Sequence, residues 1–408
     1  FAALQQEFYR LCGTRLFDEV EVTLREIHLP EPAPLAVSRR EAGPAAPQNV
    51  FLIMRQESAQ DADPIEYGCS ILTTGSKATV FKARQTVKKS DLESHLAKLT
   101  TDDVLTPRGL PKFGDTLTSL VLPPSIISVL GRQLDHPLVV VHDAASSRIP
   151  WETVRIEGKF PALENGLSHR YEADDLSIAK WLEQRQQSTT LNVLVIANPT
   201  EDLSGAQAEG TRITTLLDGL KPAVFPKALF GKDARKNDIL NLLWSGKFDV
   251  IHYAGHAFFD LTDPARSGIV CAGKEILSGA DLANIGSLPS LVFFNACESG
   301  RLRRGAETAA IDPNKHTVER VHRGVSFAEA FLRGGIANYL GTYWPVNDSA
   351  ALTFSEIFYR QILQGETLGS SIMTGRKAVE KSSSADWADY ILYGDANFTL
   401  KTRTSTPP

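Results

Sequence analysis

The sequence predicts an α/β fold, in which a mostly parallel sheet carries helices on both faces and is preceded by a smaller strand-rich domain. After about residue 115, short apolar segments alternate with stretches of helical periodicity, which is typical of a parallel sheet with crossover helices. These segments contain few polar residues, as expected for strands covered on both sides. Before residue 115 the chain indicates strands: apolar and polar residues alternate at 20–25, which is typical of a half-buried strand, and further apolar stretches follow. We therefore expect a domain at 1–114 and a larger one at 115–408.

The N-terminal domain is interrupted by a linker. Residues 30–48 are rich in Pro and Ala, so we expect an exposed, partly extended segment there. A helix is expected from Ser90, whose hydroxyl and Glu93 match a capping box, to about Leu99. Strands are expected at 20–25, 50–54, 71–72 and 78–81.

The larger domain follows a doubly wound pattern. Strands are expected at 138–141, 193–197, 250–253, 291–294 and 336–340. Helices are expected at 175–186, 205–217, 234–244, 326–332, 349–362 and 368–379.

Composition excludes several classes of protein. The chain has 408 residues, enough to bury a sizeable core, and its 42% hydrophobic and 22% charged residues argue against disorder or collagen. With 43 basic and 48 acidic residues, the net charge of −5 gives no basic surface for direct nucleic-acid binding.

Cysteine use and the start of the chain indicate a cytoplasmic protein. The four cysteines are scattered, so a disulfide framework is not expected. Apolar runs stay short of the roughly 20 residues of a membrane span, and the first residues lack signal-peptide order. Residue 1 is Phe rather than Met, so we expect a trimmed or processed chain, with an upstream regulatory module or an activating protein as a partner.

Two predicted strands end in reactive side chains. The strand 248–253 leads into His256, and the strand 291–294 leads into Cys297. In an open α/β sheet, reacting groups gather outside the carboxyl ends of the strands. An imidazole beside a thiol can hold the thiolate and later protonate a leaving amine, which favours a cysteine nucleophile. The alternative is that the cysteine is a small buried residue and the histidine an ordinary satisfied polar group.

The same segments resemble the histidine and cysteine motifs of CHAT domains, caspase-like cysteine peptidases of the caspase, separase and gingipain group. The two motifs are HYAGH at 252–256 and NACESG at 295–300. Supporting segments follow the order of the family across residues 115–402: IPWE at 149–152, ANP at 197–199, DL at 202–203, GA at 205–206, YWPV at 343–346, Asp348, and YGD at 393–395.

The resemblance implies a caspase-like fold and assigns roles to individual residues. Cys297 would be the nucleophile and His256 the general base and acid. The backbone amides of Cys297 and Ala257 would hold the oxyanion. The family usually has Gly in place of Ala257, so a left-handed backbone there would be strained by the methyl group.

A metal site is not favoured. His252 precedes His256 by four residues, but on a strand such positions are about 13 Å apart by rise alone, and the HExxH pattern is missing. We expect neither a metal nor another cofactor.

Substrate preference follows from acidic residues at the predicted rim. Asp202, Glu298 and Asp348 would favour Arg or Lys before the cleaved bond, through charge-assisted hydrogen bonds. The alternative is that Asp202 and Asp348 cap the helices that follow them.

The segment 300–324 is expected to be a long charged loop. It contains Arg301, Arg303 and Arg304, and relatives of the caspase type carry their activation loop at this place. Self-cleavage after one of these arginines is one hypothesis; a solvated insertion is the other.

The sequence therefore predicts a cysteine endopeptidase that cleaves a protein partner after a basic residue. The resemblance places it in prokaryotic signalling or immunity, with a gasdermin-like pore former as one example of a substrate. The alternative is a catalytically silent scaffold that uses the cleft to bind a peptide or partner.

Overall fold

A computed structural model of the chain describes residues 49–59, 61–73, 80–100, 104–172, 190–220, 224–258, 266–282, 285, 288–295, 328, 330–332, 334–343, 346–382 and 384–400. They belong to a compact unit that runs from Pro47 to Pro408. The predicted strand at 20–25, the linker at 30–48 and the helix at 175–186 lie outside the described residues.

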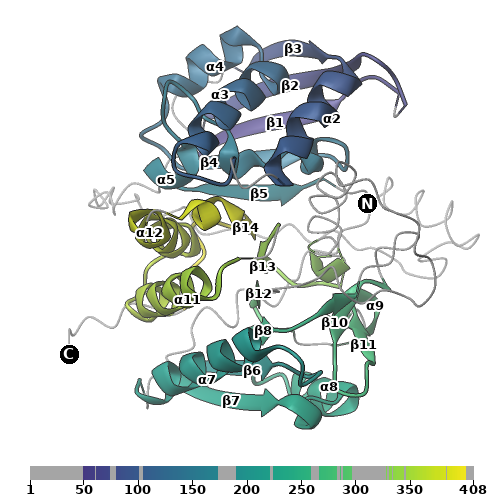
Figure 1. Cartoon of the computed structure of the whole chain (residues 1–408), viewed down its shortest axis with the longest axis vertical. Helices are drawn as coiled ribbons and strands as arrows, with labels where there is room; N and C mark the ends of the chain where they lie inside the picture. The colour runs from purple at the N-terminus through teal and green to yellow at the C-terminus, as the bar shows by residue number, and fades with distance from the viewer. Residues whose placement is uncertain are drawn as a thin grey trace, which may run out of the picture. The chain divides into compact units, whose positions relative to one another are not determined.

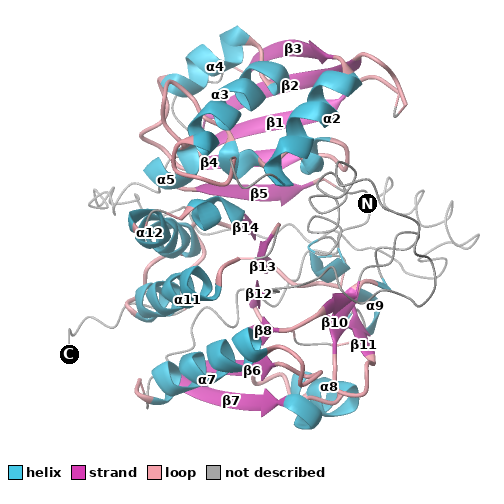
Figure 2. Cartoon of the chain, in the orientation of Figure 1, coloured by secondary structure: helices cyan, strands magenta, loops and turns pink. Residues whose placement is uncertain are grey.

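A large sheet of 11 strands organises this unit (Figures 1 and 2). The strands lie in the order β3-β2-β1-β4-β5-β14-β13-β12-β8-β6-β7. Their bounds are β1 (Val50–Gln56), β2 (Ile65–Thr73), β3 (Phe81–Val87), β4 (Leu138–His142), β5 (Leu167–Tyr171), β6 (Leu191–Ala197), β7 (Val224–Phe230), β8 (Val250–Ala254), β12 (Leu291–Asn295), β13 (Asn338–Thr342) and β14 (Tyr390–Tyr393).

Neighbouring strands are parallel except at three places. β1–β2, β2–β3 and β13–β14 are antiparallel. The antiparallel step at β13–β14 divides the sheet into two parallel blocks, which we call the first block (β1, β4, β5, β14) and the second block (β13, β12, β8, β6, β7). A mostly parallel sheet with helices is therefore confirmed.

Burial along the strands follows their position in the sheet. Every residue of β8, β12, β13 and β14 is buried, as expected for strands covered on both faces. β1 and β2 alternate between buried and partly exposed residues, so only one of their faces packs on the core. A second sheet of three short strands, β9 (Ala257–Phe258), β10 (Gly268–Val270) and β11 (Ile276–Ser278), follows β8.

Helices connect and cover the strands (Figure 2). They are α2 (Lys89–Ala97), α3 (Gly109–Val121), α4 (Pro124–Gly131), α5 (Pro161–Glu164), α7 (Ser204–Asp218), α8 (Lys236–Trp244), α9 (Gly279–Leu282), α11 (Asp348–Leu363) and α12 (Leu368–Lys381). α7 packs on β6, β7 and β8, and α12 packs on α11 and β14. Among the described residues, no helix is both long and apolar enough to cross a membrane.

Several sequence predictions need correction. The helix expected from Ser90 begins at Lys89, and its N-cap residue Lys88 makes no side-chain cap. The strands β5, β7 and β14 were not expected at all. The division into domains at 1–114 and 115–408 stays a prediction; β1 to β3 belong to the same sheet as β4.

Candidate functional site

The predicted site lies where two adjacent strands end. β8 and β12 are parallel neighbours, and their register pairs Ala254 with Asn295, the last residue of each strand. His256 follows two residues after Ala254. Cys297, Glu298, Arg301, Arg303 and Arg304 lie outside the described residues.

His256 is held by a carboxylate. The residue is 4% exposed, and its Nε2 lies 3.0 and 3.1 Å from the two carboxylate oxygens of Asp202. Because a carboxylate can only accept hydrogen bonds, Nε2 carries the proton and donates it. The structure thus brings together two of the predicted site residues.

The side chain of Asp202 is exposed and accepts hydrogen bonds from two residues, Thr200 and His256. Thr200 donates its hydroxyl to Asp202 Oδ1, and the Asp202 side chain remains 60% exposed. Slight burial raises the pKa of Asp202, but the hydrogen bonds from Thr200 and His256 outweigh it and bring the pKa below its ordinary value. Asp202 is therefore ionised at neutral pH.

The turn that presents Asp202 is built by Asn198. Asn198 has φ of 48°, a left-handed conformation that Asn tolerates better than most residues. Its side-chain Oδ1 accepts the Leu203 backbone N–H at 2.9 Å, and its own N–H donates to the Ala254 carbonyl at 2.8 Å. The turn after β6 is thus tied to the end of β8.

Neither Asp202 nor Asp348 is the N-cap of the helix that follows it. The N-cap of α7 is Leu203, so the alternative that Asp202 caps this helix is wrong. α11 is capped by Asn347, whose side chain accepts the Ser349 N–H, and Asp348 is the first residue of the helix.

Tyr253 fixes the backbone of His256. Its hydroxyl donates to the His256 carbonyl at 2.5 Å and lies 3.0 Å from the Val270 carbonyl. A Cβ at Gly255 would stand 2.6 Å from this hydroxyl, so only glycine leaves room for it. Burial, with a smaller contribution from Cys271, raises the pKa of Tyr253 far above its ordinary value, so the phenol stays neutral.

Ala257 does not adopt the strained backbone that was expected. It begins β9 and pairs with Ile269 of β10, and it is not among the residues with positive φ. The methyl group therefore imposes no left-handed strain, because extended backbone suits any residue.

A buried polar cluster ties the two strands together below the rim. Glu209 Oε1 of α7 accepts a hydrogen bond from Asn295 Nδ2 at 2.8 Å. The same oxygen lies 3.1 Å from His252 Nε2. The other ring nitrogen of His252 lies 3.2 Å from the Tyr359 hydroxyl. His252 is thus a structural residue, and the described residues contain no group of three or more His, Cys, Asp or Glu arranged to hold a metal.

Sequence reasoning missed Glu209, Asn295 and Tyr253 as supporting residues. Glu209 occupies the buried face of α7 together with Ala206, Ile213 and Leu217. A carboxylate within such an apolar stripe is a signal of a buried polar partner, and it could have been found.

The two described thiols are unsuited to catalysis. Cys69 and Cys271 are free and buried, and burial raises the pKa of each to about 12. Both are thus protonated and poorly nucleophilic at neutral pH.

A family comparison identifies the chain. The sequence model of the CHAT domain matches residues 111–395, more than half of its length. The chain belongs to the CHAT domain family. This membership confirms the resemblance to caspase-like peptidases that the two motifs indicate.

Other comparisons add little to the CHAT assignment. Curated proteins give no match. Two crystal structures of the Saccharomyces cerevisiae separase–securin complex each align at 15% identity and a TM-score of 0.41, over 63% of this chain and 15% of theirs. Protein GSU0716 from Geobacter sulfurreducens aligns at 12% identity and a TM-score of 0.31, over 53% of this chain and 100% of its own.

Proposed function

We propose that this CHAT domain is a cysteine endopeptidase in which Cys297 attacks the peptide carbonyl and His256 moves the proton. The observation that carries the proposal is the hydrogen bond from His256 to Asp202 at the end of β8, beside the end of β12 that leads into Cys297. A buried histidine oriented by a carboxylate at this edge is the arrangement that a nucleophile requires.

Asp202 acts here as the residue that orients the ring. With Nε2–H donated to Asp202, Nδ1 is the nitrogen that can take the thiol proton. The ionised carboxylate also favours the imidazolium that forms when the thiolate is generated.

The reaction proceeds through an acyl-thioester. The Cys297 thiolate adds to the carbonyl carbon, and the backbone amides of Cys297 and Ala257 receive the oxyanion. His256 then protonates the leaving amine as the C–N bond breaks, and later removes a proton from the water that hydrolyses the thioester. No cofactor takes part in these steps.

The preference for Arg or Lys is assigned to acidic residues at the predicted rim. Since the carboxylate of Asp202 is bonded to His256 and Thr200, the specificity role that the sequence gives to three residues falls mainly to Glu298 and Asp348. Each would form a charge-assisted hydrogen bond with a basic side chain.

Substrate and setting follow from family resemblance. We propose a protein substrate in prokaryotic signalling or immunity, for example a gasdermin-like pore former, and a cytoplasmic location. An upstream module or an activating protein would control the activity.

Self-cleavage at Arg301, Arg303 or Arg304 is tested by intact-mass analysis of wild type and Cys297→Ala. Fragments only in the wild type support it. The same mass pattern in both proteins contradicts it.

The competing function is a catalytically silent scaffold that binds a peptide or partner at the same edge of the sheet. Hydrolysis of fluorogenic peptides with Arg or Lys before the reporter separates the two functions. We expect activity in the wild type and in Cys271→Ala, and its loss in Cys297→Ala and His256→Ala. Binding of these peptides without hydrolysis under any activating condition favours the scaffold.

A further inference from the structure

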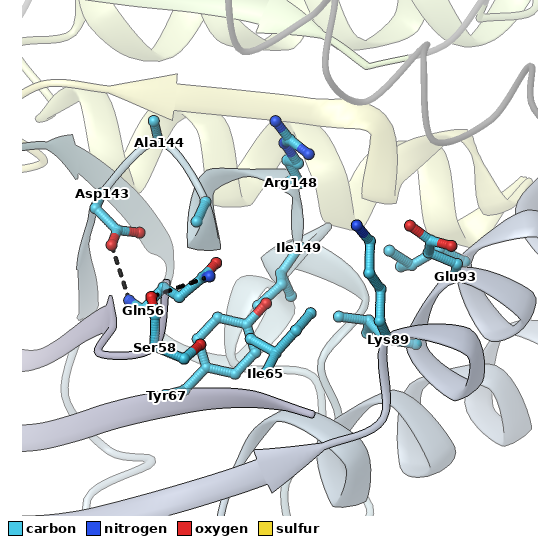
Figure 3. A pocket seen from close by; sticks show the side chains of 13 residues that line it. Gln56, Ser58, Ile65, Tyr67, Lys89, Glu93, Asp143, Ala144, Arg148 and Ile149 are labelled. Atoms are coloured by element: carbon cyan, nitrogen blue, oxygen red, sulfur yellow. Dashed lines mark hydrogen bonds between the residues drawn. The ribbon is translucent and has the colours of Figure 1, made fainter. Parts of the chain in front are cut away.

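A cavity lies far along the sheet from the candidate peptidase site. It has a volume of about 360 Å³ and is lined by β2, α2 and the segment that follows β4 (Figure 3). Four strands, β5, β14, β13 and β12, separate β4 from β8 in the sheet order. The cavity therefore lies beside the first block, and its lining shares no residue with the candidate peptidase site.

The wall after β4 is built by Asp143. Its two carboxylate oxygens accept the backbone N–H groups of Gln56 and Ser146, both at 2.8 Å, and Oδ1 also accepts the Ser146 hydroxyl at 2.6 Å. The Trp151 indole donates to the Ser146 carbonyl at 3.1 Å from a fully buried position. The segment that carries Arg148 is thus anchored on both sides.

Tyr67 presents its hydroxyl to this cavity. The residue is 2% exposed and lines the cavity from β2, and its hydroxyl has no hydrogen-bond partner among the described residues (Figure 3). Burial raises the pKa of Tyr67 to about 12, with Asp143 adding to the effect and Arg148 opposing it. The phenol therefore stays protonated and is available to donate a hydrogen bond. Because the hydroxyl opens into the cavity and is not bonded to the described part of the protein, it can donate to a ligand bound there.

Two cations stand at the same cavity. Lys89 of α2 and Arg148 of the segment after β4 both line it, and within the described parts of the chain neither side-chain charge has an ion-pair partner (Figure 3). Ile65, Leu92 and Ile149, all buried, provide apolar surface between them. This lining combines two cations, one hydroxyl and apolar side chains. It suits a ligand that carries an anionic group on an apolar group.

The nature of the anion follows from the remaining charge. Glu93 lies one helical turn after Lys89 and also lines the cavity. Glu93 and Asp143 bring the net charge of the described lining to zero, although neither forms an ion pair with Lys89 or Arg148. The two cations can therefore hold one carboxylate locally, whereas most of the charge of a polyphosphate would stay uncompensated. The volume is at the small end of ligand sites, which suits a molecule of amino-acid size.

We propose that this cavity binds a small monocarboxylate with an apolar side group, whose carboxylate lies between Lys89 and Arg148 and accepts a hydrogen bond from Tyr67. The same chemistry is presented by a free organic acid and by the C-terminal residue of a peptide. Binding requires no peptidase activity.

The test is calorimetric titration of the full chain carrying Cys297→Ala, which prevents consumption of any peptide. N-acetyl-leucine is compared with N-acetyl-leucinamide, which has the same shape without the charge. We expect the acid to bind at least about tenfold more tightly than the amide, since a hydrogen bond to a charged group is involved. Equal affinities, or no binding of the acid up to about 10 mM, overturn the proposal.

Variants locate the binding. Lys89→Ala and Arg148→Ala should each weaken binding of N-acetyl-leucine about tenfold and Tyr67→Phe a few-fold, whereas the exposed Lys112→Ala on α3 should leave it unchanged. Melting temperatures establish that each variant is folded. Affinity that is unaffected by Lys89→Ala and Arg148→Ala together contradicts the assignment.

Two further probes distinguish the source of the carboxylate. Tighter binding of 4-methylpentanoate than of an acetylated Gly-Gly-Gly-Leu peptide indicates a free acid. Tighter binding of the peptide indicates a chain terminus.

Discussion

The two parallel blocks of the sheet each contain a buried histidine–glutamate pair, and the pairs are surrounded differently. In the first block, His169 Nε2 of β5 lies 2.8 Å from Glu152 Oε1. In the second, His252 Nε2 of β8 lies 3.1 Å from Glu209 Oε1. Both histidines are fully buried.

The first pair has a buried cation. Arg376 of α12 is fully buried and donates to Glu152 Oε1 at 3.0 Å and to the Tyr390 carbonyl. The second pair has neutral neighbours: within the described parts of the chain, Glu209 is bonded by Asn295 and Ser355 but by no Lys or Arg. This difference indicates that the first cluster mainly stabilises the fold, whereas the second positions the ends of β8 and β12.

The largest expected effect is the loss of the buried cation. Arg376→Met should lower the free energy of unfolding by about 3–5 kcal/mol, because Glu152 would stay buried without its cation. Urea unfolding measures it. The matched control is Arg212→Met, which breaks an exposed pair with Glu356 at 2.9 Å and should cost under about 1 kcal/mol. Equal losses would mean that the cluster contributes no more than a surface pair.

A second difference is a histidine in the first block that resists protonation. Burial, and then His169, lower the pKa of His142 from 6.5 to about 3. The unfolded chain takes up a proton below pH 6.5 while the folded chain does not, so stability is complete above that pH and falls as pH drops from 6.5 towards 3. At pH 5 the loss should be about 2 kcal/mol. Burial also lowers the pKa of His95, so part of the loss between pH 7 and pH 5 should remain in His142→Gln. Urea unfolding at both pH values should show a loss about 2 kcal/mol smaller in His142→Gln than in the wild type. The same loss in both would exclude His142 as its source.

Substitutions near the ends of β8 and β12 in the second block should lower activity more than stability. Asp202→Asn should lower kcat/KM about tenfold, since the ring loses its orienting charge. That charge is complete above the ordinary pKa of 3.8 and is lost only as pH falls through the still lower folded-state pKa. The defect should therefore be constant between about pH 5 and 8. Steady-state kinetics measure it, with Thr200→Val as the milder control; wild-type activity in Asp202→Asn would remove Asp202 from the mechanism.

The smallest effect is expected below the rim. Glu209→Gln should reduce kcat/KM a few-fold, because Glu209 joins the strands that lead into His256 and Cys297, and small misplacements slow a reaction. Glu209→Gln should lower the free energy of unfolding less than Glu152→Gln does, because Glu152→Gln leaves the buried Arg376 without a carboxylate partner. The reverse ranking would contradict the division of roles between the blocks.

The sequence predicts the strands that are almost entirely apolar, but not those that contain several polar residues or a proline. β6, β8 and β12 are nearly all apolar and were expected close to their actual bounds. β5 contains Ser168, His169 and Arg170, and these polar residues conceal the strand in the sequence. Its buried histidine is instead satisfied by a partner from another segment of the chain, Glu152. β7 lies at the sheet edge and contains Pro226, which is tolerated only there.

Site residues were found more readily than their partners. Sequence motifs located His256 and Asp202 near one rim, but the bond between them depends on the left-handed turn at Asn198. Such geometry follows from tertiary contacts and not from local pattern. The cap assigned to Ser90 failed for a similar reason, because the start of α2 is set by the Asp63 carboxylate that accepts the Lys89 N–H.

The most direct test of the account is the rate at which iodoacetamide alkylates Cys297 at pH 7, followed by peptide mass analysis in wild type and His256→Ala. An imidazole beside the sulfur should make Cys297 react at least about tenfold faster in the wild type. Equal rates in the two proteins would show that the ring does not act on the thiol and would contradict the proposed dyad.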